Sequence, residues 1–302
     1  MAKMKKNETS TVRQSKHSGL LTLFFTILSI AWIAPILVVL LNSFKRKAYI
    51  FRNPFGISAA SLSDGMDRWK LGIHKAMCGL LNYSNGLKQT DFFKCFGLSL
   101  FITVGSVVAI ILFCSMTAWY LTRVHTVVSK TIYVLCLFSM IVPFQMVMFT
   151  LSKFANILHL ATPWGIIVVY LGFGAGLAVF MFSGFIRSIS LEIEEAAFID
   201  GCTPLQTFFQ IIFPILKPTT VTIAILEAMW VWNDYLLPSL VLNINKYKTI
   251  PIAVQYLKQS HGQLDWGAMM AVLVLAIVPI IVFYLACQKY IIEGVVAGAV
   301  KG

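Results

Sequence analysis

Residues 96–121 read FGLSLFITVGSVVAIILFCSMTAWYL and contain no charged side chain. A helix needs about 20 mostly apolar residues to cross the hydrocarbon core of a bilayer, because the core is about 30 Å thick and each residue rises about 1.5 Å. This stretch meets that length. It predicts a membrane-spanning helix and places the chain among integral membrane proteins.

Five further segments of comparable length are apolar enough to span. Of these, only 219–242 carries charged residues, namely Glu227 and Asp234. The sequence therefore predicts an all-α membrane protein with six transmembrane helices, at 19–41, 96–121, 131–151, 163–186, 219–242 and 267–287. A tail over 1–18, an extracytoplasmic loop over 42–95, which is long enough to hold a small amphipathic subdomain, and a second tail over 289–302 complete the chain.

The composition supports the membrane class. Of 302 residues, 58% are hydrophobic and 12% are charged, against roughly 25% charged in soluble domains. Lys and Arg number 24 against 12 Asp and Glu, but they punctuate apolar runs instead of clustering, so we expect no nucleic-acid binding. The six cysteines lack CxxC spacing and the five histidines are dispersed, which predicts neither a disulfide framework nor a metal site.

The basic N-terminal tail bears on orientation. An even number of spans places both termini on one side, and the lysines and arginine of the tail favour the cytoplasm. The first apolar run is too long for a signal peptide and lacks a small-residue cleavage site, which predicts an uncleaved span. The loop over 42–95 is also rich in cations, so charge counting by itself leaves the orientation open.

The segment between the fourth and fifth predicted spans begins with a short helix. Ser190 is a good N-cap, and Glu192, Glu194 and Glu195 lie in the first turns, where carboxylates interact favourably with the helix dipole. Gly201 is suited to the positive φ that ends a helix. These residues predict a helix that stops at a tight turn.

A second helix follows the turn. Thr203 is its expected cap, Pro204 suits its first position, and Gln206 completes a capping box. Pro214 and Pro218 prevent this helix from continuing smoothly into the fifth span. The product is a helix, turn and helix unit, charged on one face and held flat at the membrane surface. Capping residues alone favour an ordinary amphipathic interfacial loop.

The full residue pattern is more specific than the caps. It has the form E-A-A-x-x-x-G followed by I-x-x-P, and this resembles the EAA loop of binding-protein-dependent ABC importer permeases. The sequence departs from the usual pattern at Cys202 and Phe213, and both keep the apolar character of their positions. The matching positions, with the neighbouring Asp200, are Glu195, Ala196, Ala197, Asp200, Gly201, Ile211 and Pro214.

The resemblance implies a fold and a set of partners. It implies a type I importer permease of MetI-like core over 96–288, in the membrane of a bacterial cell with both termini cytoplasmic. The loop over 190–218 would form the coupling helix that seats in the ATPase. The implied partners are a homologous MalF-type permease, two ABC ATPase subunits that bind ATP and Mg, an extracytoplasmic sugar-binding protein, membrane lipid and the carbohydrate. No cofactor is implied for this chain.

Two further stretches narrow the family. Residues 232–238, WNDYLLP, look like a stretch of carbohydrate importer permeases, and residues 294–302, GVVAGAVKG, resemble the tail of the MalG-type subunit. The second resemblance implies that Lys301 and Gly302 reach the ATPase. The chain has no G-x-x-x-x-G-K-[ST] loop, so any ATP hydrolysis belongs to another polypeptide and this chain is expected not to be an enzyme.

The polar residues of the fifth span allow two interpretations. Glu227 and Asp234 are seven positions apart and share a helix face. Together with Asn233 they are candidates for lining the transport pathway. Alternatively, Glu227 pairs with a neighbouring helix and Asp234 is hydrated at the outer end of the span. Trp230, Trp232 and Tyr235 either stack on a sugar ring or anchor the helix at the interface.

Two other functional classes compete with the importer. An intramembrane serine protease needs a G-x-S-G turn and a histidine within a span; Ser99 and Ser183 lack that setting. A secondary transporter of a small polar solute also uses intramembrane carboxylates, but it predicts related halves and no dock for an ATPase. The E-A-A pattern favours the importer.

Overall fold

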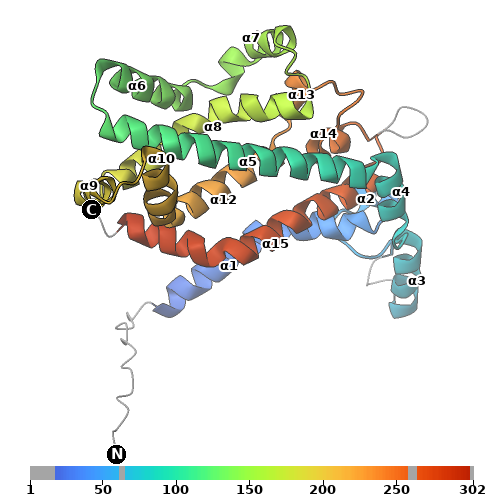
Figure 1. Cartoon of the computed structure of the whole chain (residues 1–302). Helices are drawn as coiled ribbons and strands as arrows, with labels where there is room; N and C mark the ends of the chain where they lie inside the picture. The colour runs from blue at the N-terminus through green and yellow to red at the C-terminus, as the bar shows by residue number, and fades with distance from the viewer. Residues whose placement is uncertain (1–17, 61–64, 258–263, 300–302) are drawn as a thin grey trace, which may run out of the picture. The chain divides into compact units, whose positions relative to one another are not determined.

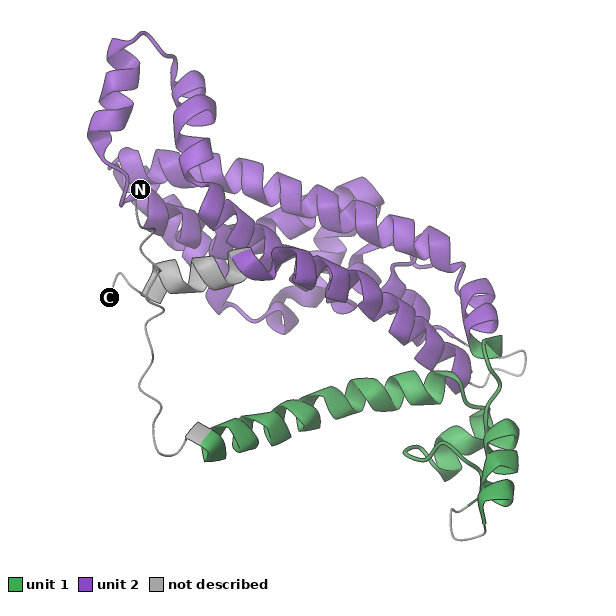
Figure 2. Ribbon diagram, turned by 90° about the horizontal axis from the view of Figure 1, so that it is seen from below, with its two compact units in different colours: residues 1–82 green, residues 83–302 purple. Residues whose placement is uncertain are grey.

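The computed structural model describes residues 18–60, 65–257 and 264–299. These residues form helices and no sheet strand, which confirms the predicted fold class. The chain divides into two compact units, residues 1–82 and 83–302, which Figure 2 colours separately. Four helices are long and apolar enough to span a membrane, or six if each of two bent helix pairs is one span.

The first unit holds a long apolar helix and a small subdomain. Its helices are α1 (Ser18–Ser43), α2 (Lys47–Arg52) and α3 (Met66–Ala76). Side chains tie the segments together: Lys45, fully buried, donates from Nζ to the carbonyls of Asn53 and Pro54 at 2.8 and 3.1 Å. Burial lowers the pKa of Lys45. The loop predicted over 42–95 therefore contains ordered helices.

Helices α5 (Phe92–Arg123) and α8 (Pro163–Ile186) form the centre of the second unit and run side by side (Figure 1). Ile102 packs with Ile166 near one end, and Arg123 reaches Ile186 at the other, so the two helices run parallel. Thr162 caps α8 by accepting from the Gly165 amide at 3.0 Å, and Pro163 occupies the first position. Small α8 residues allow this close packing.

The third predicted span, 131–151, is not one straight helix. The structure has α6 (Val127–Ile141) and α7 (Phe144–Ile157), which meet at an angle of 110°. The break falls at Val142 and Pro143, both with extended backbone. Proline lacks an amide hydrogen and disfavours helical geometry in the residue before it, which explains the end of α6.

The fifth predicted span, 219–242, is also interrupted. Helix α12 (Lys217–Asn233) ends before Asp234, and α13 (Leu236–Val241) begins two residues later. The carboxylate of Asp234 accepts from the amides of Leu236 and Leu237 at 2.9 and 3.3 Å, so it starts a new helix instead of continuing the old one. The sequence prediction did not include this break.

The remaining helices complete the second unit. Helix α14 (Ile250–Gln255) contacts α5, and α15 (Trp266–Ala299) contains the expected span 267–287. Helix α4 (Leu81–Gln89) starts at the boundary of the units, and its Gly86 faces Ala268 and Val272 of α15. Residues Lys301 and Gly302, the proposed ATPase contacts of the tail, lie outside the described residues.

Candidate coupling site

The short helix α9 (Leu191–Ile199) begins and ends where its caps predict. The Ser190 hydroxyl accepts from the Glu192 amide at 3.3 Å. Gly201 has a φ of +84°, a conformation that residues with side chains rarely adopt, so the turn after α9 strongly favours glycine. Local sequence therefore determines both limits of this helix.

The second helix of the loop has the predicted capping box. The Thr203 amide donates to Oε1 of Gln206 at 2.8 Å, and the Gln206 amide donates to the Thr203 hydroxyl at 3.4 Å. This helix consists of α10 (Pro204–Gln206), the π-helical segment η2 (Thr207–Ile212) and α11 (Phe213–Ile215). It meets α12 at an angle of 76°, close to Pro214 and Pro218, as expected. The π-helical segment was not predicted.

Most residues of the E-A-A pattern lie at the surface. Glu195, Ala196, Asp200 and Gly201 are exposed, whereas Ala197 is buried. Farther along, Ile211 is half-buried and Pro214 is exposed. A Cβ added to Gly201 would meet no atom within 4 Å, so this glycine leaves open space above the turn. We call these four exposed residues the EAA surface (Glu195, Ala196, Asp200 and Gly201).

One acidic residue of α9 points inward. Glu194 is buried, in contrast to the prediction that the charges of this unit lie on one face, and it pairs with Arg123 at the end of α5. Sequence reasoning grouped Glu194 with Glu192 and Glu195. Glu194 shares the buried side of α9 with Ala197, but the sequence could not distinguish it from the other two glutamates, because its contact joins residues distant in the chain.

An apolar core lies directly beneath the coupling loop. Phe208 and Ile212 of η2, both fully buried, pack with Phe182 of α8 and Ala118 of α5. Leu216, between η2 and α12, joins the same cluster. The same cluster contains Ile223 of α12, so the loop packs against α5, α8 and α12 in one closely packed core.

The two carboxylates of the fifth span both face α8. A Cβ added to Gly174 would lie 3.1 Å from Oε2 of Glu227, and the Tyr170 hydroxyl donates to Oδ2 of Asp234 at 3.0 Å. Tyr170 and Gly174 are one helical turn apart and lie on the same face of α8. Glu227 and Asp234, which were predicted to share a face, therefore both contact this one face of α8. Oε2 of Glu227 is buried and has no hydrogen-bond partner among the described residues.

The other candidates of this span have different surroundings. The exposed Asn233 donates from Nδ2 to the Met229 carbonyl at 2.7 Å. Trp232 is buried, and its indole nitrogen donates to the Ala276 carbonyl at 3.4 Å. Trp230 is exposed and packs edge-on against Tyr170.

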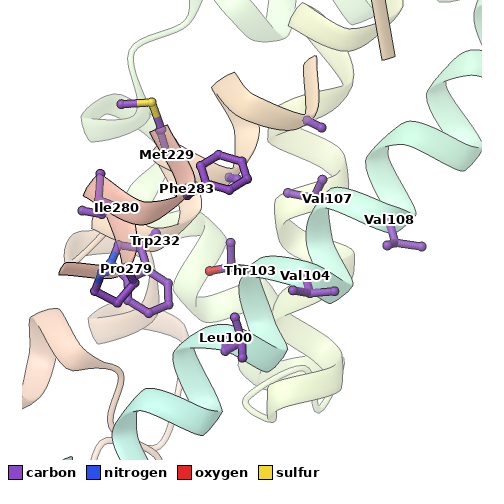
Figure 3. Close-up of a pocket in the computed structure, with 12 residues that line it drawn as sticks. Leu100, Thr103, Val104, Val107, Val108, Met229, Trp232, Pro279, Ile280 and Phe283 are labelled. Atoms are coloured by element: carbon purple, nitrogen blue, oxygen red, sulfur yellow. The ribbon is translucent and has the colours of Figure 1, made fainter. Parts of the chain in front are cut away.

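A cavity of about 230 Å³ lies between α5, α12 and α15 (Figure 3). Thr103 supplies its only hydroxyl, and the lining contains no charged residue. Binding of a sugar needs many hydrogen bonds, so this cavity is unsuited to a carbohydrate. A second cavity of about 400 Å³ is polar and is lined by Asp91, Lys94, Tyr247 and Tyr256 among others.

The polar cavity and the loop over 190–218 lie at opposite ends of α5. The polar cavity is at the start of this helix and the coupling loop is at its end. A helix of 32 residues is about 48 Å long, since each residue rises about 1.5 Å, which exceeds the thickness of the hydrocarbon core. The coupling loop and the polar cavity thus belong to opposite sides of a membrane.

Sequence comparison places this arrangement in a family. Residues 102–296 match the family described as "Binding-protein-dependent transport system inner membrane component". The chain is 37% identical to the probable starch degradation products transport system permease protein AmyC of Thermoanaerobacterium thermosulfurigenes, over 93% of this chain and 96% of AmyC. It is 31% identical to the melibiose/raffinose/stachyose import permease protein MelC of Bacillus subtilis, over 96% and 99%.

The fold has a counterpart among solved structures. A chain in the crystal structure of a bacterial ABC transporter involved in the import of the acidic polysaccharide alginate matches with a TM-score of 0.70 and 21% identity, covering 93% of this chain and 99% of that one. At that identity the likeness concerns the fold. From the match over 102–296 and the similarity to AmyC and MelC, we conclude that this chain belongs to the binding-protein-dependent transport system inner membrane components, the multi-pass permeases of ABC importers.

Proposed function

We propose that this chain is the permease subunit of an ATP-driven carbohydrate importer and that it is coupled to its ATPase through the EAA surface. The exposed Glu195, Ala196 and Gly201, on a loop packed against the ends of α5 and α8, are the observation that carries the proposal. An exposed dock of this kind has no role in a secondary transporter. The chain itself supplies the pathway and no hydrolytic chemistry.

The carbohydrate class is supported by several similar permeases. The names of AmyC and MelC refer to starch degradation products and to melibiose, raffinose and stachyose. The permease MsmG of Streptococcus mutans, 37% identical over 66% of this chain, is named for a multiple sugar-binding transport system. The WNDYLLP stretch over 232–238 points to the same class.

The proposed complex has four further protein subunits. We place beside this chain a homologous MalF-type permease, two ATPase subunits on the cytoplasmic side and an extracytoplasmic sugar-binding protein, with both termini of this chain cytoplasmic. Closure of the ATPase dimer around ATP and Mg would draw the paired coupling helices together. The core of Phe208, Ile212 and Phe182 would then carry that displacement into the spanning helices.

The roles of Glu227, Asn233 and Asp234 in the pathway remain part of this proposal. Their contacts support a share in holding α12 against α8, because Asp234 binds Tyr170 and Glu227 lies against Gly174. Asn233 is the one of the three that is exposed. We therefore assign Asn233 to the pathway lining ahead of the two carboxylates.

Substitution of Gly201 by asparagine tests the coupling role. Asparagine tolerates positive φ, so Gly201→Asn keeps the turn and adds a side chain to the EAA surface. We expect Gly201→Asn to insert normally into the membrane. ATP-dependent sugar uptake should fall about tenfold, as when coupling between sites is lost. Uptake is measured with radiolabelled maltotriose, raffinose or another sugar that the wild-type complex transports. Glu195→Lys should act in the same way by reversing the charge at the dock.

Gly79 provides a matched control. It also has positive φ, +59°, with no atom within 4 Å of an added Cβ, but it lies in the first unit outside the coupling loop. Gly79→Asn is expected to leave uptake unchanged. Normal uptake by both Gly201→Asn and Glu195→Lys would contradict the proposal.

A further inference from the structure

The buried carboxylate of Glu194 is held by two side chains of α5. Its Oε1 accepts from Nε of Arg123 at 2.8 Å and lies 2.7 Å from Nη2 of the same guanidinium. Its Oε2 accepts from the indole of Trp119 at 3.0 Å. The Glu194 side chain is 5% exposed and that of Arg123 17%, so solvent screens this pair far less than it screens a surface ion pair.

The guanidinium of Arg123 also binds the backbone between α8 and α9. Nη2 donates to the carbonyls of Ile186 and Ile189, at 3.4 and 3.1 Å. Ile186 is the last residue of α8, where a helix leaves carbonyls without intrahelical partners. One side chain at the end of α5 therefore joins the end of α8, the linker and the coupling helix α9.

Trp119 extends the same network to the second helix of the loop. Its ring lies against the ring of Phe208, with centroids 5.6 Å apart. Phe208 is fully buried in η2 and belongs to the core beneath the loop. Trp119 thus contacts α9 through its indole nitrogen and η2 through its ring.

We propose that Arg123, Glu194 and Trp119 form a positioning lock, which makes α9 and the cytoplasmic ends of α5 and α8 move as one body when the ATPase closes. Apolar contacts alone resist separation but tolerate sliding, because they lack direction. Hydrogen bonds between charged groups impose direction and distance, so they fix the register of α9 on α5. This proposal rests on the proposed function, since it concerns how force applied at the EAA surface enters the spans.

Two conservative substitutions are expected to weaken the lock. Glu194→Gln keeps the volume and removes the charge, and Trp119→Phe keeps the packing on Phe208 and removes the indole donor. Arg123→Lys keeps the charge but lacks the planar fork that reaches all three segments, so an intermediate effect is expected. Glu192→Gln is the matched control, because Glu192 is an exposed carboxylate on the same helix.

The experiment measures distances in the assembled importer between spin labels, with the native cysteines replaced. One pair, Tyr120→Cys and Ile199→Cys, joins α5 to α9; the other, Phe93→Cys and Val282→Cys, joins α5 to α15. All four native side chains are exposed. In the wild type we expect the first distance to stay narrow and unchanged when ATP and vanadate trap the complex, while the second one shifts.

In Glu194→Gln and Trp119→Phe we expect the distribution of α5–α9 distances to broaden, while ATP hydrolysis continues. The trapped population with a shifted α5–α15 distance should fall about tenfold, a size typical of lost coupling contacts. A role in stability alone would lower the yield of complex and leave both distances as in the wild type. That result, or an equal effect of Glu192→Gln, would overturn the lock. Absence of any shift in the wild type would instead contradict the proposed function.

Discussion

Neighbouring carboxylates of α9 have opposite surroundings. Glu195 is exposed and available to another subunit, whereas Glu194 is buried against Arg123. Removing one partner of a buried ion pair leaves the other charge uncompensated, which typically costs about 3–5 kcal/mol, whereas an exposed charge contributes about 0–1 kcal/mol. We therefore expect a substitution at 194 to lower the stability of the chain and one at 195 to leave that stability nearly unchanged.

Two glycines of α8 also differ in their surroundings. An added Cβ at Gly176 would lie 2.6 Å from Cγ of Met140 and 2.8 Å from the Cys136 carbonyl of α6, whereas at Gly172 it would meet no atom within 4 Å. We expect Gly176→Ala to destabilise the protein by about 1–3 kcal/mol, because the backbone of α6 has to move. Gly172→Ala should be neutral.

Thermal unfolding of the purified permease complex in detergent measures this difference. A lower midpoint for Gly176→Ala together with an unchanged one for Gly172→Ala is the expected result. Equal midpoints for the two variants would contradict close packing of α6 on α8 in the purified complex.

Helix breaks at Pro143 and Asp234 decide how two spans are built. Pro143 ends α6 through the covalent restriction of proline, whereas Asp234 ends α12 by binding the first amides of α13 and the Tyr170 hydroxyl of α8. The Ser152 hydroxyl of α7 also donates to the Leu240 carbonyl of α13, at 2.7 Å. Helix α7, which follows the first break, therefore packs on α13, which follows the second. The two irregular elements stabilise one another.

A double-mutant cycle tests whether Asp234 is a structural residue of this break. Asp234→Ala removes the acceptor of two amides and of the Tyr170 hydroxyl, so we expect a loss of about 2–4 kcal/mol from the helix cap and the unpaired hydroxyl together. Tyr170→Phe removes the hydroxyl only. In the double variant the total loss of stability should be smaller than the sum of the two single losses, because either substitution alone already removes the hydrogen bond between Asp234 and Tyr170.

Asp234→Asn separates this role from sugar contact. The amide oxygen of asparagine still accepts from the backbone, so the unfolding midpoint should change little. Unchanged stability with abolished sugar uptake in Asp234→Asn, together with additive losses in the cycle, would assign Asp234 to the pathway instead.

The placement of the coupling loop and the polar cavity at opposite ends of α5 predicts the topology of the second unit. With the six native cysteines replaced, a membrane-impermeant maleimide should label Lys246→Cys in intact cells, because Lys246 lines the polar cavity and is exposed. Glu192→Cys should react only after permeabilisation. The reverse pattern would place the coupling loop outside and contradict the proposed function.

The sequence by itself determined the membrane class, the apolar segments long enough to span, the caps of the coupling loop and its E-A-A pattern. These features depend on apolar length, proline and glycine geometry and hydrogen bonds within a few residues, all of which are local. Only the tertiary structure decided that Glu194 faces Arg123, 71 positions away, and that Glu227 and Asp234 both meet α8. Burial depends on segments that are distant in the chain. The local sequence of a short helix therefore does not indicate which of several identical side chains will be buried.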